Sequence, residues 1–204
     1  LAVILSSVQA MESDWENAGR FLKTIKSEGD RMSRLIGDML SLANADNKSW
    51  SIMKTDCELD TLLLDTYEKY QPILHGKKIS LKVVLPEEPL SICKCDSARI
   101  SQVLGILLDN GASYVPAGGR MEMGVKENEK YFQLYVQDNG PGIPDENKEA
   151  VFRRFYRADP ARKEKQHFGL GLCIAREIVT LHKGSIRILD TPGGGSTFVI
   201  RLPK

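Results

Sequence analysis

The sequence has almost no excess charge of either sign. Its 28 lysines and arginines against 27 aspartates and glutamates give a formal net charge of +1 at pH 7. This balance offers no electrostatic reason to bind nucleic acid or an anionic membrane, and we expect no nucleic acid as a partner. No apolar run approaches the roughly 18 residues of a membrane-spanning helix, and no signal peptide is visible. We therefore expect a cytoplasmic location.

Cysteine is scarce as well. The 4 cysteines include no Cys-x-x-Cys pair, and Cys93 and Cys95 stand two positions apart in a strand-like stretch. That spacing suits reduced, structural thiols better than a zinc site. A hydrophobic fraction of 42% with 27% charged residues is ordinary for a globular chain, and 204 residues are enough for one or two domains.

Residues 1–47 are expected to be helical. Ala2–Met11 is mostly apolar, and Glu-Ser-Asp at 12–14 indicates a break with a cap for the next helix. From Glu16 the apolar residues recur at spacings of three and four over about 30 residues, or roughly 45 Å. They are Phe21, Leu22, Ile25, Met32, Leu35, Ile36, Met39, Leu40 and Leu42. The first helix alone cannot cover such a stripe, so we expect a dimeric helical bundle.

Residues 48–204 mix strand and helix patterns. Strands are expected at 51–56, 79–85, 121–126, 131–137, 184–189 and 196–202. Helices are expected at 58–70, 97–113, 146–153 and 171–182. We predict that Pro72 ends the first of these helices, that Asp96 caps the second, and that the third and fourth strands form a hairpin. The fold class is then α+β: a helical hairpin followed by an α/β sandwich with helices on one face of a mixed sheet.

The segment Asp-Asn-Gly-Pro-Gly-Ile-Pro at 138–144 directly follows the expected strand 131–137. Asp-Asn-Gly is good turn chemistry, since Asn and Gly tolerate positive φ, and a turn is the simpler interpretation. The alternative is a ligand pocket in which Asp138 contacts a base edge and the glycines let a nucleotide approach the backbone.

Phe-Gly-Leu-Gly-Leu at 168–172 opens an expected helix. Glycines at a helix start allow either phosphate binding at the exposed N–H groups or close helix–sheet packing. The segment is not a P-loop, because GxxxxGK[ST] is absent, and it does not follow a strand as a Rossmann turn does.

Asp109 and Asn110 interrupt an apolar helix. A buried Asn must find partners, either within the fold or by helping to hold a hard cation such as Mg²⁺. Gly-Gly-Gly-Ser-Thr at 193–197 is most simply a hairpin turn, although its hydroxyls can reach a ligand.

In this order and with these spacings, the four segments resemble the catalytic core of a bacterial sensor histidine kinase of two-component systems. The resemblance covers essentially the whole chain. It implies the ATP-binding (Bergerat or GHKL) fold shared with Hsp90, MutL and gyrase-type ATPases. It further implies a truncated dimerisation and histidine-phosphotransfer hairpin at 1–47 and an ATP-binding catalytic domain at 48–204.

The resemblance assigns roles to individual segments. Residues 138–144 correspond to the first glycine box, with Asp138 accepting from the adenine amino group. Residues 152–157 correspond to the phenylalanine box, 158–167 to a lid over the triphosphate, and 168–172 to the second glycine box at the phosphates. The cofactors implied are ATP and Mg²⁺.

In the same way, Asn110 is assigned to Mg²⁺, Tyr114 to the side of the base, Thr197 to the floor of the adenine pocket and Arg157 to phosphate charge. The full set of residues expected to bind ATP is Asn110, Tyr114, Asp138, Gly140, Gly142, Ile143, Phe155, Arg157, His167, Gly169, Leu170, Gly171, Leu172 and Thr197.

The implied reaction transfers the ATP γ-phosphate to a histidine and then to an aspartate of a response regulator that docks on residues 1–47, which also form the homodimer. Residues 1–7 resemble the sequence just after the histidine box, so the acceptor is expected before Leu1 and the chain itself is expected not to autophosphorylate. His75 lies in a polar turn, His167 in the lid, and His182 at a helix end, where positive charge suits the dipole. The parent protein is expected to be bacterial, with membrane contact only through segments upstream.

Three features depart from the family. Ile106 stands where a second Asn is frequent, Ser113 where a Lys is frequent, and Gln-His-Phe at 166–168 replaces a leading glycine. These changes favour weaker metal binding and leave open a degenerate, non-catalytic signalling scaffold. A clamp that hydrolyses ATP, like Hsp90 or MutL, is disfavoured by the long helix, the phenylalanine box and the lack of an acidic residue at 106.

Overall fold

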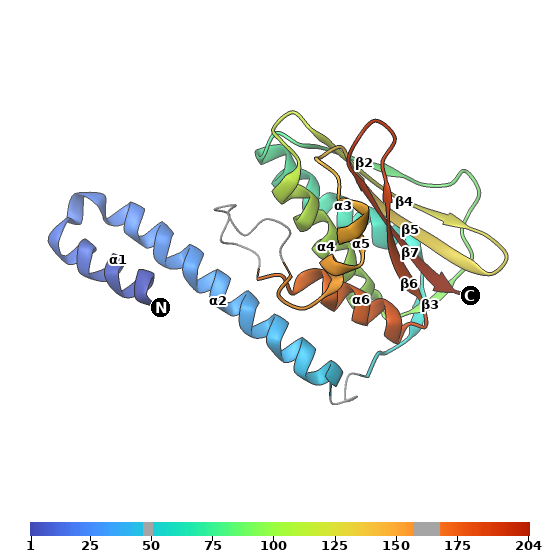
Figure 1. The fold of residues 1–204 in the computed structure, drawn as a ribbon, viewed down its shortest axis with the longest axis horizontal. Helices are drawn as coiled ribbons and strands as arrows, with labels where there is room; N and C mark the ends of the chain where they lie inside the picture. Colours follow the sequence, from blue (N-terminus) through green and yellow to red (C-terminus); the bar gives the residue numbers. More distant parts are fainter. Residues whose placement is uncertain (47–50, 157–167) are drawn as a thin grey trace. The chain divides into compact units, whose positions relative to one another are not determined.

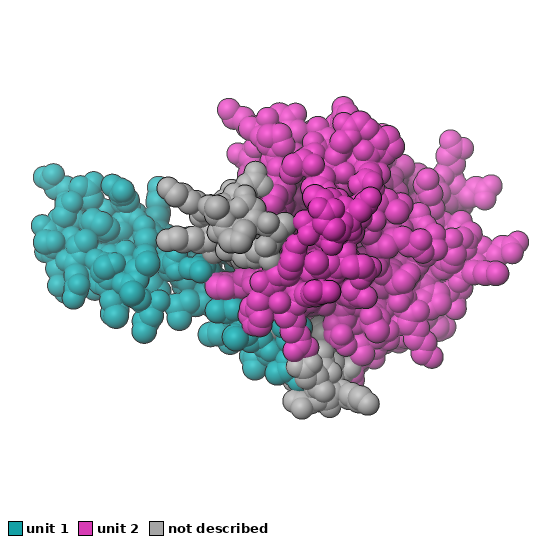
Figure 2. All heavy atoms as spheres, viewed as in Figure 1, with its two compact units in different colours: residues 1–50 teal, residues 51–204 magenta. Residues whose placement is uncertain are grey.

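The computed structural model describes residues 1–46, 51–156 and 168–204. The chain divides into two compact units, residues 1–50 and residues 51–204 (Figure 2). The segment expected to form a lid, together with Arg157 and His167, lies outside the described residues. Within the described part, no helix is both long and apolar enough to cross a bilayer.

The first unit is a helical hairpin, as the sequence predicts. Helix α1 (Ala2–Ser13) is followed by a short 3₁₀ helix, η1 (Trp15–Asn17), and by the 29-residue helix α2 (Ala18–Asp46). The expected cap is present, because the Asp14 carboxylate accepts a hydrogen bond from the Asn17 N–H at 3.3 Å. Helices α1 and α2 pack against each other (Figure 1).

The second unit is built on a five-stranded mixed sheet of order β2-β4-β5-β7-β6. Strand β2 (Ser80–Val84) runs parallel to β4 (Arg120–Glu127), whereas β5 (Tyr131–Asp138), β7 (Ser196–Pro203) and β6 (Ser185–Asp190) extend the sheet with antiparallel pairs. The predicted β4–β5 hairpin is confirmed. A separate two-stranded sheet joins β1 (Thr55–Cys57) to β3 (Cys93–Cys95).

Three long helices, α3 (Leu59–Gly76), α4 (Ser97–Tyr114) and α6 (Gly171–Leu181), cover one face of the large sheet (Figure 1). Burial alternates strictly along β5, so every second residue of this strand faces the helices. Phe132, Leu134 and Val136 form the apolar part of that series, and Asp138 is its last member. The strand that builds the core therefore also places one carboxylate at the edge of the core.

The prediction that Pro72 ends its helix was wrong, because α3 continues to Gly76. Proline in a helix interior costs about 3 kcal/mol through the missing N–H and a clash with the preceding turn. The next turn carries Leu74, which is completely buried. Burial of such a side chain stabilises the fold by roughly 1.5–3 kcal/mol, which offsets the cost of the proline and allows the helix to continue past it.

The helix expected at 146–153 consists instead of two short pieces, α5 (Asp145–Lys148) and η2 (Ala150–Phe152). The chain leaves η2 at Arg153 in an extended conformation. Residues 153–155, within the expected phenylalanine box, therefore form a bend and a turn instead of continuing a helix.

Candidate nucleotide-binding site

Asp138 ends β5 with its side chain toward the helices and only 8% exposed. Its Oδ1 atom accepts hydrogen bonds from the N–H groups of Gly140 at 2.8 Å and Ser196 at 3.3 Å. Among the described residues, no protein donor reaches Oδ2. Burial raises the pKa of this carboxyl, and the two N–H donors partly oppose the increase. One oxygen is thus fixed by the backbone, and the other is available as an acceptor.

Glycines surround Asp138, and at several of them a side chain would collide with neighbouring atoms. A Cβ on Gly195, whose φ is +107°, would lie 2.0 Å from the Asp138 carbonyl oxygen. A Cβ on Gly140 would lie 2.9 Å from Asp138 Oδ1, and one on Gly111 of α4 would lie 2.2 Å from Met121. Gly142 also adopts a positive φ, +79°. The glycines of 138–144 and 193–197 therefore build one thin wall, which sequence alone could not distinguish from two separate turns.

Helix α4 approaches this wall at Gly111, where a Cβ would lie 3.9 Å from the Asp138 Cβ, and Asn110 is the preceding residue. Asn110 is half-buried and lies one turn after Ile106, on the same side of the helix. Tyr114, at the end of α4, is 40% exposed, and its backbone lies 3.7 Å from the position of a Cβ on Gly140. Asp109 accepts a hydrogen bond from Tyr70 of α3 at 3.4 Å. Asp109 therefore links α4 to α3, unlike its neighbour Asn110, which we consider as a metal ligand.

The second glycine segment meets α4 at the start of α6. Gly171 is the first residue of α6, and a Cβ there would lie 3.1 Å from the Ile106 side chain. The residue at the N-cap position, Leu170, makes no side-chain cap hydrogen bond. Leu170 is buried in the core, whereas Leu172 is half-buried. The structure therefore shows the close packing, against Ile106, whereas phosphate binding at these glycines stays a prediction.

Gly169 adopts a φ of +73°, and its carbonyl accepts a hydrogen bond from the Phe155 N–H at 2.9 Å. A Cβ at position 169 would lie 2.7 Å from the Tyr156 carbonyl oxygen, so only glycine fits. Phe155 itself has a φ of +61° and is 60% exposed. The phenylalanine segment and the second glycine segment are thus neighbours. Ile143 is half-buried in the loop after Gly142.

Thr197 is not brought to Asp138. Register pairs Thr197 with Gln137, on the sheet face away from the helices, and its hydroxyl bonds to that of Thr191 at 2.9 Å. Ser196, buried and one residue earlier, takes the place beside Asp138. The sequence reasoning missed Ser196, because only the β5–β7 register decides which of two adjacent hydroxyl residues faces the helices.

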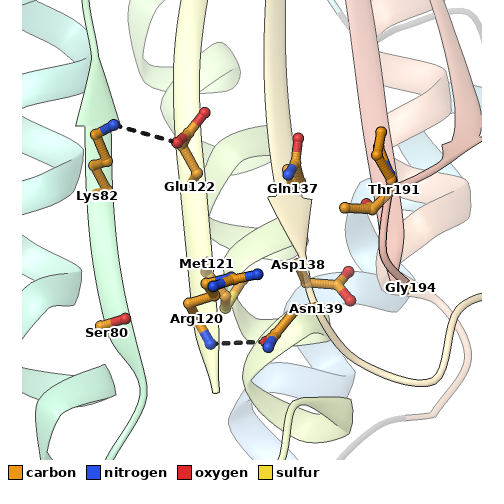
Figure 3. A pocket seen from close by; sticks show the side chains of 11 residues that line it. Ser80, Lys82, Arg120, Met121, Glu122, Gln137, Asp138, Asn139, Thr191 and Gly194 are labelled. Atoms are coloured by element: carbon orange, nitrogen blue, oxygen red, sulfur yellow. Dashed lines mark hydrogen bonds and ion pairs between the residues drawn. The ribbon is translucent and has the colours of Figure 1, made fainter. Parts of the chain in front are cut away.

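A hollow of about 200 Å³ lies on the opposite face of the sheet (Figure 3). Lys82 and Glu122 line it and form an ion pair at 3.7 Å, and Arg120, Gln137 and Asn139 lie nearby. The lining also includes the buried residues Met121 and Asp138, so the hollow adjoins the group around Asp138.

Comparisons with known proteins agree with this arrangement. Residues 95–204 match the family described as histidine kinase-, DNA gyrase B- and HSP90-like ATPase, and the chain belongs to that family. Residues 1–48 match the His Kinase A (phospho-acceptor) domain. Together, in this order, the two matches make the chain the catalytic core of a sensor histidine kinase, as the sequence predicts.

Among curated proteins, the chain is 35% identical to sensor histidine kinase WalK of Bacillus subtilis over 213 residues, which cover 100% of the chain and 34% of WalK. It is 32% identical to sensor protein SrrB of Staphylococcus aureus over 200 residues, again 34% of that protein. The chain thus spans about a third of the length of these relatives.

Among solved structures, the catalytic domain of histidine kinase ThkA is 27% identical, with a TM-score of 0.67 over 74% of this chain and 96% of that one. ThkA in complex with response regulator protein TrrA has a TM-score of 0.77 at 23% identity, over 99% of this chain and 57% of that one. These matches support the α+β fold predicted from sequence.

Proposed function

We propose that the chain binds ATP with Mg²⁺ between Asp138, Asn110 and the start of α6, and that it delivers the γ-phosphate to a histidine. The observation that carries this proposal is the Asp138 carboxylate, held by two backbone donors with its second oxygen available. A fixed acceptor behind a thin glycine wall suits the amino group of adenine, which donates a hydrogen bond. Ser196, in place of Thr197, would form the floor beside the base.

Mg²⁺ fits the residues present. No group of three His, Cys, Asp or Glu side chains within the described ranges could hold a metal ion, so an all-protein cage is not offered there. Mg²⁺ is commonly held by one or two protein oxygens together with substrate phosphates and water. Asn110, half-buried on α4 one turn from the Ile106–Gly171 contact, would supply that oxygen. When bound, the ion would offset negative charge on the phosphates.

The phosphates would lie at the start of α6. Aligned N–H groups at a helix N-terminus attract anions, and Gly169 and Gly171 allow close approach of the backbone. Phosphoryl transfer asks mainly for positioning and charge stabilisation, and these residues can provide both. Arg157, His167 and a lid over 158–167 remain part of the proposal.

The acceptor histidine is proposed to lie just upstream of residue 1. His182 is a poor substitute, because it is 2% exposed and both ring nitrogens are engaged in hydrogen bonds. His75 lies at the surface in the last turn of α3. Neither histidine is presented in the helical hairpin that matches the phospho-acceptor domain.

The hairpin is proposed to form a homodimer and to receive a response regulator. Large apolar side chains remain exposed on α1 and α2 in the single chain, among them Leu5, Leu22, Ile36 and Leu40. A stripe of this kind is covered when two hairpins form a four-helix bundle. The regulator is proposed from the ThkA–TrrA complex.

The test is transfer of label from γ-labelled ATP. We expect no label on residues 1–204 alone, and label on a version extended upstream through the acceptor histidine. Replacing that histidine with Gln in the extended version is the matched control. Label on the extended version that survives this replacement would contradict the proposal.

A non-catalytic scaffold is the second candidate, and Ile106 is the observation that favours it. Its apolar side chain packs on Gly171. At position 106, family members often carry a second Asn. A scaffold would bind nucleotide without dependence on Mg²⁺ or on the γ-phosphate, or would not bind it.

A further inference from the structure

His182 follows the last turn of α6 and is buried. Its Nε2 atom accepts a hydrogen bond from the Asp96 N–H at 3.0 Å. Nδ1 lies 2.7 Å from the Ile178 carbonyl oxygen and must therefore carry the proton. Burial lowers the pKa of this imidazole, and nearby Lys54 lowers it further, against the Ile178 carbonyl and Asp96, which raise it. With one nitrogen accepting and the other donating, the imidazole in this arrangement is neutral.

Asp96 connects three parts of the unit. Its N–H donates to His182, its Oδ1 caps α4 by accepting from the Arg99 N–H at 3.1 Å, and its Oδ2 accepts from the Met53 N–H at 3.0 Å. Met53 belongs to the segment at 51–54 with which the second unit begins. The predicted cap of α4 is confirmed, and the same residue also makes a hydrogen bond at the end of α6.

Helices α4 and α6 pack against each other in opposite directions. The start of α4 meets the end of α6 at Asp96 and His182, and Ile106 of α4 meets Gly171 at the start of α6. Asn110 lies one turn beyond Ile106. The hydrogen-bonded junction therefore closes one end of a helix pair whose other end carries the candidate metal and phosphate groups. Asp138, on β5, lies outside this pair.

We propose that His182 is a positioning residue for nucleotide phosphates: through Asp96 it sets how α4 lies against α6, and hence where Asn110 stands relative to Gly171. The proposal rests on the proposed nucleotide site. Loss of the junction releases the far ends of the two helices, so the phosphate and metal contacts weaken while the adenine contact at Asp138 is kept.

The experiment is calorimetric titration of the chain with ATP–Mg²⁺ and, separately, with adenosine. His182→Leu removes both hydrogen bonds, whereas His182→Gln supplies one donor and one acceptor on a neutral side chain. Leu63→Ala, at a completely buried position of α3, serves as a control for general destabilisation. All titrations are made at a temperature where each variant is folded.

We expect His182→Leu to bind ATP–Mg²⁺ about tenfold more weakly and to bind adenosine unchanged, with His182→Gln within about threefold of the original chain. Equal ATP–Mg²⁺ affinity of the Leu variant and the original chain would overturn the proposal. So would an equal loss for ATP and adenosine, or a matching ATP-specific loss in Leu63→Ala. Failure of the original chain to bind either ligand would instead overturn the proposed nucleotide site.

If His182→Leu does not fold, His182→Phe decides the question. Phe keeps a planar ring of similar size but can neither accept from the Asp96 N–H nor donate to the Ile178 carbonyl. We expect an ATP-specific loss of at least about threefold, and an unchanged ATP affinity would overturn the role of this junction.

Discussion

At the end of β5, Asp138 combines burial with a charge. The raised pKa of its carboxyl means that the ionised form is less stable in the folded chain than in the unfolded one. A raised folded pKa contributes stability only at low pH, and this contribution is lost as the pH rises through the folded value. At neutral pH the residue therefore costs stability, which is consistent with a side chain retained for binding.

The first prediction concerns Asp138→Asn. The amide oxygen can keep the hydrogen bonds from Gly140 and Ser196, while an N–H₂ group replaces the oxygen that would accept from adenine. We expect adenosine affinity to fall by roughly tenfold to a hundredfold, the range for a hydrogen bond to a charged group, and the melting temperature to stay equal or rise. Calorimetry and thermal unfolding measure the two quantities. Unchanged affinity, or loss of the fold, would contradict this role.

Substitution of Gly195 and of Gly194 tests how closely the backbone at 195 packs against Asp138. Both have a φ of +107°, but a Cβ on Gly195 would lie 2.0 Å from the Asp138 carbonyl, whereas a Cβ on Gly194 would meet nothing within 4 Å. We expect Gly195→Ala to lower the free energy of unfolding by about 1–3 kcal/mol more than Gly194→Ala, since the backbone strain is common to both. Chemical denaturation of the two variants tests this. Equal losses would mean that the approach to Asp138 is not a constraint.

At the scale of elements, α3 carries a proline that it tolerates. Pro72 is exposed, so its replacement by Ala removes no core packing and restores an N–H to the helix. We expect Pro72→Ala to raise the free energy of unfolding by about 1–3 kcal/mol, reduced by the gain of chain freedom in the unfolded state. Denaturation with urea measures it, with nucleotide affinity as the internal control. A destabilised variant would show that the proline, and not the burial of Leu74, favours this helix.

The junction between α4 and α6 predicts a pH dependence. Because the folded pKa of His182 is lowered, the unfolded chain takes up a proton first as the pH falls below about 6.5, and stability present above that pH is lost. The unfolding free energy should fall by up to about 1.4 kcal/mol per pH unit from this residue. We expect a shallower slope below pH 6.5 in His182→Gln than in the original chain. Identical slopes in the two chains would contradict a buried neutral imidazole.

For the whole molecule, spacing along the chain located most elements. The structure places Gly169 beside Phe155 and Gly171 against Ile106, one turn before Asn110. Alternation in β5 and the stripe of α2 are local patterns, so they are visible in sequence. Three other features depend on tertiary structure, so they could not be predicted from the sequence. The choice of Ser196 over Thr197 needs strand register, the passage of α3 through Pro72 needs the burial of Leu74, and the neutrality of His182 needs its distant partner Asp96.

The most direct measurement is calorimetric titration of the chain and of Asn110→Ala with ATP, each in Mg²⁺ and in EDTA. If ATP is bound with its metal at Asn110, Mg²⁺ should strengthen binding to the original chain, and that gain should disappear in Asn110→Ala, while binding in EDTA is similar for both. An equal gain from Mg²⁺ in the two chains would place the metal elsewhere. Absence of ATP binding by the original chain would contradict the nucleotide site itself.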